Sequence, residues 1–423
     1  MDNHWIGNKH KIISRLSHDI PLAMVLFAVC SFFGFHHLAV SGKERSIIAL
    51  EPYVFQAAIP LTAGQGLYEP DPDQTPEITA FFNGEIESIN LSDLSKSIPE
   101  NDIASAGEYH VYLNYTVAFL WRLFGISRRS LEPLAVFMFA WTALAVYGLL
   151  RCGMRKSIAF LCTLALMFSP AMIYEFPYIR DFSKAPFLFT MAFMLAFSVK
   201  QRLHGFCLLL FVGLLGLIHG VALGFRQDAL IFLPLILCLL VIISYRGALY
   251  RRTVSTHKYL KKGASVLGAL LVYLTAFLIV AWPMLGKMEG GADPYHPLIM
   301  GCSMKHMRNL GIRPNMYEIL ASGQDHYAFN AYYHHYNRNS DAPKEHFGWD
   351  TPGSAKAAKE MFIDYIVHFP GDMLTRVYAS CFRALRYADA YTNLQFNKSH
   401  PVYEMLSNSH LALSRHLHRF GLL

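Results

Sequence analysis

The feature that most constrains this chain is a series of long apolar segments separated by polar connections. A helix needs about 20 mostly apolar residues to cross the hydrocarbon core of a bilayer. The composition agrees, because 53% of the 423 residues are hydrophobic and only 16% are charged. The sequence therefore predicts an all-α membrane protein with about seven transmembrane helices. The segments are Ile20–Val40, Leu131–Leu150, Ser157–Ile173, Ala185–Val199, Gly205–Ala222, Ala229–Tyr245 and Ala264–Leu285.

Basic residues beside these segments predict their orientation. Short cytoplasmic flanks carry an excess of Lys and Arg. If the segments alternate, four basic flanks fall on one side, namely Lys9–Arg15, Arg151–Lys156, Lys200–Arg202 and Arg246–Lys262. We therefore expect a multi-pass protein of the cytoplasmic (inner) membrane, with its N-terminus inside and its C-terminus outside. The first apolar run has no small-residue cleavage site after it, so we expect a retained anchor.

The same topology divides the chain into three parts. Residues 1–19 form the cytoplasmic N-terminus, residues 20–285 the membrane core, and residues 286–423 a small, mainly helical extracytoplasmic region. The core includes a long first outer loop, residues 41–130. Within it, Ser46–Leu61 and Tyr112–Gly125 are apolar at helical spacing but too short to span, which predicts interfacial helices. The acidic stretch Glu69–Glu108 favours a solvated insertion over a metal site.

Two outer turns are unusually charged for connections between membrane helices. Tyr174–Phe187 carries Glu175, Arg180, Asp181 and Lys184, and Gly224–Asp228 carries Arg226 and Asp228. Ionisable residues at the ends of membrane helices are costly unless they serve a purpose or reach water. Arg180 and Lys184 would share one face of a helix, and both cations suit a phosphate group. The alternative is that neighbouring charges in each turn form local ion pairs that end helices.

Several short motifs follow one another in a characteristic order between the first and last apolar segments. They are His110, Trp121, Leu123-Phe124-Gly125, Ser127, Leu131, Pro133, Tyr147 and Arg151, then "LALMFSPAMIY" and "LIHGVALGFRQDALIFLPLIL". In order, spacing and topology this pattern resembles the GT-C superfamily of membrane glycosyltransferases, of the type that uses polyprenyl-phosphate or dolichyl-phosphate sugars. The resemblance implies a core of transmembrane helices with a long first outer loop.

The resemblance also implies a reaction. A sugar passes with inversion from a polyprenyl-phosphate donor to a hydroxyl of a glycan, lipid or protein, at the extracytoplasmic face. The transfer would be metal-independent or weakly metal-dependent, with a divalent metal left open as the one cofactor. Such chemistry needs a carboxylate base for the acceptor hydroxyl and fixed cations for the departing phosphate.

Candidate residues for these roles lie in the outer loop and the charged turns. Glu51 is the candidate base, with Glu44 as runner-up; Glu51 would alternatively cap a helix that begins at Pro52. The candidates for the donor and its phosphate are Arg180, Asp181, Lys184, Arg226, Asp228 and His110. His110 is alternatively an interfacial histidine without a ligand.

The chain departs from the family pattern at the acidic pair, usually Asp-Glu, that follows the first span. Here Leu50 precedes Glu51. A non-catalytic member that binds a polyprenyl lipid or acts as a scaffold therefore stays open. A transporter is the third alternative, and the small number of charges within the spans argues against it. His219 is the one exception, and a hydrogen-bonded interior histidine explains it more simply.

The C-terminal region adds weaker candidates. Gly323–Asn339 is rich in Tyr, His and Asn, which suits contacts to an acceptor sugar through Asp325, His326 and Tyr327. The alternative is a tyrosine-rich helix that packs within this region. Cys302 and Cys381 could pair in an extracytoplasmic compartment. The sequence contains no motif typical of nucleic-acid binding and no spacing typical of a metal site.

Overall fold

The computed structural model describes residues 3–42, 46–90, 92, 98–99, 110–201, 203, 205–249, 257–285, 295–302, 325–337 and 353–375. The chain forms two compact units, Met1–Lys287 and Met288–Leu423. The boundary between them lies close to the start of the C-terminal region expected from the sequence.

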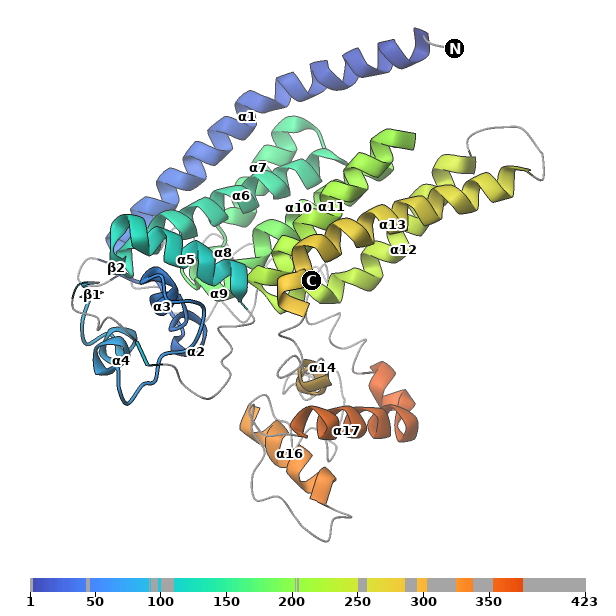
Figure 1. Cartoon of the computed structure of the whole chain (residues 1–423). Coiled ribbons are helices and arrows are strands. Elements are labelled where there is room, and N and C mark those ends of the chain that lie inside the picture. The colour runs from blue at the N-terminus through green and yellow to red at the C-terminus, as the bar shows by residue number, and fades with distance from the viewer. Residues whose placement is uncertain are drawn as a thin grey trace, which may run out of the picture. The chain divides into compact units, whose positions relative to one another are not determined.

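The first unit is a bundle of long helices with many short elements at one end (Figure 1). Its helices are α1 (Asn3–Ser41), α2 (Pro52–Phe55), α3 (Ala58–Thr62), α4 (Pro76–Asn83), α5 (Val111–Phe124), η2 (Arg129–Leu131), α6 (Glu132–Arg151), α7 (Lys156–Met167), α8 (Pro170–Glu175), α9 (Ile179–Phe182), α10 (Lys184–Gln201), α11 (Gly205–Phe225), η3 (Gln227–Ile231), α12 (Phe232–Leu249) and α13 (His257–Leu285). Strands β1 (Ser88–Ile89) and β2 (Ile126–Ser127) pair antiparallel. We call the end of the bundle that carries α2–α5, α8 and α9 the loop end.

Among the described residues, five helical stretches are long and apolar enough to cross a membrane. They are Asp19–Ser41, Arg129–Arg151, Ile179–Gln201, Gly205–Phe225 and Ala264–Met284. Two shorter apolar helices, Lys156–Met167 and Phe232–Ile243, occupy the places of the third and sixth predicted spans. The structure is therefore consistent with the predicted all-α, multi-pass membrane protein. The count of seven and the orientation remain predictions.

The third predicted span, Ser157–Ile173, is not one continuous helix. α7 ends at Met167, and α8 begins at Pro170, which has no amide hydrogen to continue the ladder. Ser169 is extended between them, and its hydroxyl accepts a hydrogen bond from the amide of Met172. The Ser-Pro pair thus starts a new helix rather than completing the old one.

Small residues allow α11 and α13 to pack closely. Gly216, Gly220 and Gly224 recur every four residues along α11. A Cβ atom at Gly216 would lie 2.5 Å from the carbonyl oxygen of Tyr273, and one at Gly220 would lie 2.9 Å from that of Phe277. Close approach of backbones at small residues is typical of helix pairs in membranes.

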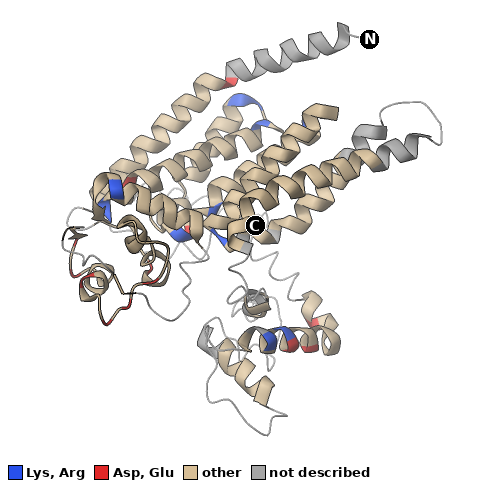
Figure 2. Ribbon diagram, viewed as in Figure 1, with Lys and Arg blue, Asp and Glu red and all other residues tan. Residues whose placement is uncertain are grey.

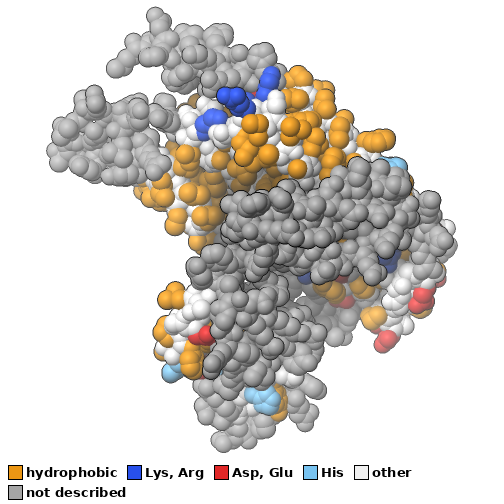
Figure 3. Space-filling view, turned by 180° about the vertical axis from the view of Figure 1, so that it is seen from behind, with side chains coloured by type: hydrophobic (Ala, Val, Ile, Leu, Met, Phe, Trp, Pro, Cys, Tyr) orange, Lys and Arg blue, Asp and Glu red, His pale blue; other side chains and the backbone are white. Residues whose placement is uncertain are grey.

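The outward faces of the bundle are apolar, and its charged side chains gather near the helix ends. Ile279 and Trp282 of α13 are 68% and 74% exposed. Figure 2 shows few Lys, Arg, Asp or Glu side chains along the middle of the bundle helices. Figure 3 shows hydrophobic side chains spread over the visible face of the bundle, with Lys and Arg side chains together at its edge. A surface of this kind suits contact with lipid.

An ion pair joins α1 to α6 at the end of α6 away from the loop end. The guanidinium of Arg151 donates to both carboxylate oxygens of Asp19, at 2.9 to 3.2 Å, and the hydroxyl of Tyr147 donates to the same carboxylate. Tyr147 and Arg151 belong to the family-like pattern in the sequence. Their common partner Asp19, 128 and 132 residues away, was not part of that pattern.

The outer loop corrects one prediction and supports another. Ser46–Leu61 was expected to be one interfacial helix, but Ser46–Leu50 contains no helix and only α2 and α3 follow. Residues 57–62 are buried, because α3 packs on α5 and Arg122 donates to the carbonyl oxygens of Leu61 and Thr62. α5 forms as expected, with Trp121 fully buried on one face and Phe119 60% exposed on another.

The second unit contains α14 (Tyr295–Cys302), α16 (Asp325–Asn337) and α17 (Ser354–His368) among its described residues. Ala328, Phe329 and Tyr332 of α16 pack with Met361 of α17 in a small core. The ring nitrogen Nδ1 of His296 lies 2.8 Å from the hydroxyl of Tyr332. This face of the tyrosine-rich helix is therefore a packing face.

Candidate functional site

Backbone pairing brings the start of the outer loop against the first charged turn. The amide of Ala49 donates to the carbonyl oxygen of Pro177 at 3.1 Å, and Ala49 and Tyr178 form an isolated parallel bridge. This pairing joins segments that are more than a hundred residues apart in the sequence. It holds Glu51 beside the turn that contains Arg180 and Asp181.

Glu51 stands directly before the first turn of α2, but its side chain does not cap the helix. The helix begins at Pro52, as expected, and Glu51 is its N-cap residue, but its carboxylate accepts no hydrogen bond from the helix. Its Oε2 atom is buried and has no hydrogen-bond partner among the residues that the structure describes. Burial raises the pKa of this carboxyl group above its ordinary value, while Arg180 and Arg226 oppose the rise. The capping alternative for Glu51 is therefore wrong, and its carboxylate stays available for other contacts.

Arg180 lies on α9 and is held by Tyr53. One terminal nitrogen of the guanidinium donates to the hydroxyl of Tyr53, and the guanidinium carbon lies 5.1 Å from the centre of the tyrosine ring. The Nε atom of Arg180 is buried and has no hydrogen-bond partner within the described ranges of the chain. The guanidinium group of Arg180 is therefore held in one orientation and still has N–H donors for a ligand.

Lys184 follows Arg180 by about one helical turn. α9 ends at Phe182 and α10 begins at Lys184, and Ser183 between them keeps right-handed helical dihedral angles (φ −56°, ψ −25°). The fully buried Ser183 donates to the carbonyl oxygen of Arg180 at 2.8 Å. The backbone is thus nearly continuous here, as the shared-face prediction requires.

The second charged turn is joined to the first by an ion pair. Arg226, at the end of α11, donates to the Oδ1 atom of Asp181. The Arg226 side chain is only 14% exposed and that of Asp181 is 38% exposed. The alternative of a local Arg180–Asp181 ion pair is therefore not what forms, because Asp181 bridges two turns. Arg180, Asp181 and Arg226 all influence the pKa of Glu51, so the four side chains share one electrostatic environment.

His110 fastens the second turn to the outer loop. Its Nδ1 atom lies 2.8 Å from the carbonyl oxygen of Phe225, the residue before Arg226, so Nδ1–H donates to that carbonyl. The side chain is 93% buried, since its exposed fraction is 7%. Close packing reinforces the link, because a Cβ atom at Gly224 would collide with the Tyr112 ring. His110 therefore positions the Arg226 turn.

Two tyrosines complete the site and were missed in the sequence. Tyr53 orients Arg180, and the hydroxyl of Tyr178 donates to that of Tyr174 at 3.3 Å. That hydrogen bond and burial raise the pKa of Tyr178 to about 12. The only sequence signal for Tyr53 is its position two residues after Glu51, which is weak in a chain with 23 tyrosines.

Other predicted site residues lie outside the described part of the chain. These are Glu44 and the side chains of Asp228, Asp325, His326 and Tyr327. Cys381 and the side chain of Cys302 are also outside it, so the pairing of these cysteines stays a prediction. Within the described residues, no three His, Cys, Asp or Glu side chains lie together as a metal site requires. The site offers two guanidinium groups and carboxylates, which do not fit a divalent metal centre.

The interior histidine has a simple structural explanation. The Nε2 atom of His219 lies 2.8 Å from the carbonyl oxygen of Ala229, so Nε2–H donates, and Nδ1 accepts from the hydroxyl of Tyr273. Both ring nitrogens are satisfied within the bundle, as expected.

Comparison of the chain with protein-family models, with curated proteins and with solved structures finds no match.

Proposed function

We propose that this protein transfers a sugar from a polyprenyl-phosphate donor to an acceptor hydroxyl at the loop end of its membrane bundle. The observation that carries the proposal is the meeting of Glu51, Arg180, Asp181 and Arg226 from three segments distant in the sequence. A half-buried carboxylate, one oxygen of which is buried and has no hydrogen-bond partner among the described residues, stands there beside two guanidinium groups. Base and phosphate-binding cations are the groups that such a transfer needs.

Glu51 has the properties of a general base. The raised pKa makes its carboxylate a stronger proton acceptor than an ordinary surface glutamate. In the proposed reaction, Glu51 takes the proton from the acceptor hydroxyl while the hydroxyl oxygen bonds to the anomeric carbon. The bond from that carbon to the donor phosphate breaks, and the electron pair leaves with the phosphate. Attack opposite the leaving group inverts the anomeric centre.

Arg180 and Arg226 have the properties of phosphate ligands. Negative charge builds on the departing phosphate, and oriented cations in a site of low dielectric stabilise that charge. Tyr53 holds the guanidinium of Arg180, and Asp181 holds that of Arg226. Both cations are therefore oriented before a donor arrives, which limits the reorganisation that binding requires.

The location suits a lipid-linked donor. Arg180 opens the apolar stretch Ile179–Gln201, and Arg226 directly follows Gly205–Phe225. A phosphate held by these residues lies at a helix end, where the interface of a bilayer meets its hydrocarbon core. The polyprenyl chain would then lie along the apolar outer faces of the bundle.

The test is native mass spectrometry of the full chain, purified in mild detergent and supplemented with a synthetic polyprenyl phosphate. Wild type is compared with Arg180→Ala, Arg226→Ala and the control Arg155→Ala, whose exposed side chain precedes α7. Retention of the lipid by wild type and the control, and about tenfold weaker retention by both site variants, supports the proposal. Equal retention by all four proteins contradicts it. Arg180→Lys, which keeps the charge, separates loss of the cation from loss of the fold.

A non-catalytic, lipid-binding member of the same kind is the second candidate. Leu50, where the family pattern has an acid, is only 6% exposed and packs in the core of the first unit. It offers no carboxylate to the site. Such a protein would bind the same donor without consuming it, and Glu51→Gln would leave the bound lipid unchanged.

A further inference from the structure

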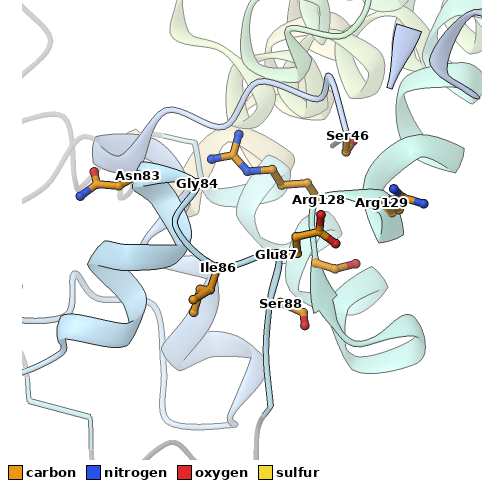
Figure 4. A pocket seen from close by; sticks show the side chains of 9 residues that line it. Ser46, Asn83, Gly84, Ile86, Glu87, Ser88, Arg128 and Arg129 are labelled. Atoms are coloured by element: carbon orange, nitrogen blue, oxygen red, sulfur yellow. The ribbon is translucent and has the colours of Figure 1, made fainter. Parts of the chain in front are cut away.

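A cavity lies in the outer loop, and its lining shares no residue with the Glu51 site. It has a volume of about 430 Å³. It opens between the end of α4, strand β1 and the turn that joins β2 to η2 (Figure 4). The polar side chains in its lining include those of Ser46, Asn83, Glu87, Ser88, Arg128 and Arg129. Cavities that take small molecules measure about 300–1,000 Å³, so the size suits one small ligand.

Arg128 makes this cavity a fixed structure. Its guanidinium donates to the carbonyl oxygens of Ile48, Phe81 and Phe82, at 3.3, 3.4 and 2.9 Å. The same group lies 5.9 Å from the centre of the Phe81 ring. Arg128 thereby ties the end of α4 to the start of the outer loop, and β1 and β2 close the wall opposite. The cavity is held open by contacts that do not depend on a ligand.

Two charged side chains in the lining, those of Arg129 and Glu87, make few contacts with the described part of the chain. Within the described part of the chain, neither the guanidinium of Arg129 nor the carboxylate of Glu87 forms a hydrogen bond or an ion pair. Figure 4 shows both side chains at the cavity, Glu87 directly before β1 and Arg129 at the start of η2. Glu132 lies near Arg129 and accepts from the hydroxyl of Ser46 at 3.4 Å, but it is not part of the lining.

The composition of the lining defines the ligand class. Two guanidinium groups stand against one carboxylate, which favours a ligand with one negative charge. The hydroxyls of Ser46, Ser88 and Ser127 and the amide of Asn83 suit a ligand rich in hydroxyl groups. Ile86 adds an apolar patch for the face of a ring. We propose that this cavity binds an acidic saccharide unit, such as a hexuronate, with its carboxylate on Arg129.

The cavity lies within reach of the Glu51 site. Ser46 lines the cavity, and Glu51 follows it by five residues. Five extended residues span at most about 18 Å, so the two sites are no farther apart than a short oligosaccharide can bridge. That the acidic saccharide belongs to the acceptor rests on the proposed function; that the cavity binds it does not.

The test measures binding of two monosaccharides of equal ring size, D-glucuronate and D-glucose, by saturation-transfer NMR on the full chain in detergent. We expect glucuronate to bind about tenfold more tightly than glucose to wild type, as one charge-assisted contact allows. Arg129→Gln should remove most of this preference. The control Arg155→Gln, which removes an exposed cation outside the cavity, should keep it.

Three outcomes overturn the proposal: no binding of glucuronate, equal binding of both sugars, or unchanged preference in Arg129→Gln. Because Arg129 has no hydrogen bond or ion pair to lose among the described residues, this variant should fold normally, and its unfolding midpoint checks that. The probe contains no lipid phosphate. Glucuronate binding without polyprenyl-phosphate binding would therefore refute glycosyl transfer and leave the cavity proposal standing. Polyprenyl-phosphate binding without glucuronate binding would refute the cavity proposal and leave glycosyl transfer standing.

Discussion

Asp181 and Arg226 lie 45 residues apart in the sequence and form an ion pair between two turns at the loop end of the bundle. This ion pair connects the two charged turns of the site. It links Arg226 to the first charged turn, while Arg180 donates a hydrogen bond to the hydroxyl of Tyr53. Arg180, Asp181 and Arg226 all influence the pKa of Glu51, so the two turns and the start of the outer loop share one electrostatic environment.

Loss of this ion pair should weaken the site and the bundle together. Asp181→Asn removes the charge of the carboxylate that the mostly buried guanidinium of Arg226 contacts. Because Asp181 is 38% exposed, we expect a modest loss of stability, about 1 kcal/mol, visible as a lower unfolding midpoint in detergent. Lys356 and Glu360, an exposed pair 3.9 Å apart on α17, supply the control. Glu360→Gln should change the midpoint much less, and equal changes in both variants would show that the bridge does not stabilise the turns.

The contact between Tyr53 and Arg180 predicts a graded loss of donor binding. Tyr53→Phe removes the hydrogen bond but keeps the ring under the guanidinium, and Tyr53→Ala removes both. Retention of a polyprenyl phosphate should therefore fall from wild type to Tyr53→Phe and again to Tyr53→Ala, each step by about three- to tenfold. Tyr115→Phe, on the exposed face of α5, is the matched control. Full retention by Tyr53→Ala would mean that Arg180 needs no orientation.

The raised pKa of Glu51 predicts how stability depends on pH. A carboxyl group whose pKa is higher in the folded state ionises first in the unfolded chain, so ionisation favours unfolding as pH rises. The stability of wild type should therefore fall as the pH rises from the ordinary carboxyl pKa through the raised one. Glu51→Gln has no carboxyl group at this position to ionise, so its stability lacks this loss. The midpoint of Glu51→Gln minus that of wild type should therefore be larger at pH 7.5 than at about pH 4. An equal difference at both pH values would mean that burial does not perturb Glu51.

The glycines of α11 predict which substitutions the bundle tolerates. Gly216→Ala would put a methyl group 2.5 Å from the carbonyl oxygen of Tyr273, so α11 and α13 must move apart. We expect a loss of about 1–3 kcal/mol, as for other overpacked interfaces. Gly268→Ala on α13 meets no atom within 4 Å and is the control. It should be neutral or slightly stabilising, because alanine favours helix over glycine. Similar midpoints for the two variants would show that close α11–α13 packing is unimportant.

The sequence predicted the class of fold because the apolar segments are long and the charges lie between them. It failed at the third segment, where Ser169 and Pro170 end one helix and start another within an apolar run. Apolarity alone does not report this break, which depends on the proline ring and the serine cap. It also failed at Ser46–Leu50, where an apolar stretch pairs its backbone with another segment instead of forming a helix.

The candidate site could be predicted as a set of residues but not as an arrangement. Arg180 and Arg226 were identified because charges at membrane helix ends are unusual, and Glu51 because it stands where the family pattern has its acidic pair. Their partners could not be identified, since Asp181 has a neighbouring arginine in sequence and bonds to a distant one in space. His110 was assigned to the donor, yet its Nδ1 atom holds the Phe225 carbonyl, a contact that only the packing of α5 on α11 creates.

One measurement tests the central claim most directly: the mass of the lipid that co-purifies with wild type and with Glu51→Gln from the same membranes. Arg180 and Arg226 are intact in both proteins, so both should hold a polyprenyl phosphate. If Glu51 is the base for transfer, wild type should carry mainly the spent polyprenyl phosphate, and Glu51→Gln should carry the donor with its sugar still attached. The same lipid in the same state in both proteins would contradict a catalytic role for Glu51 and favour the non-catalytic alternative.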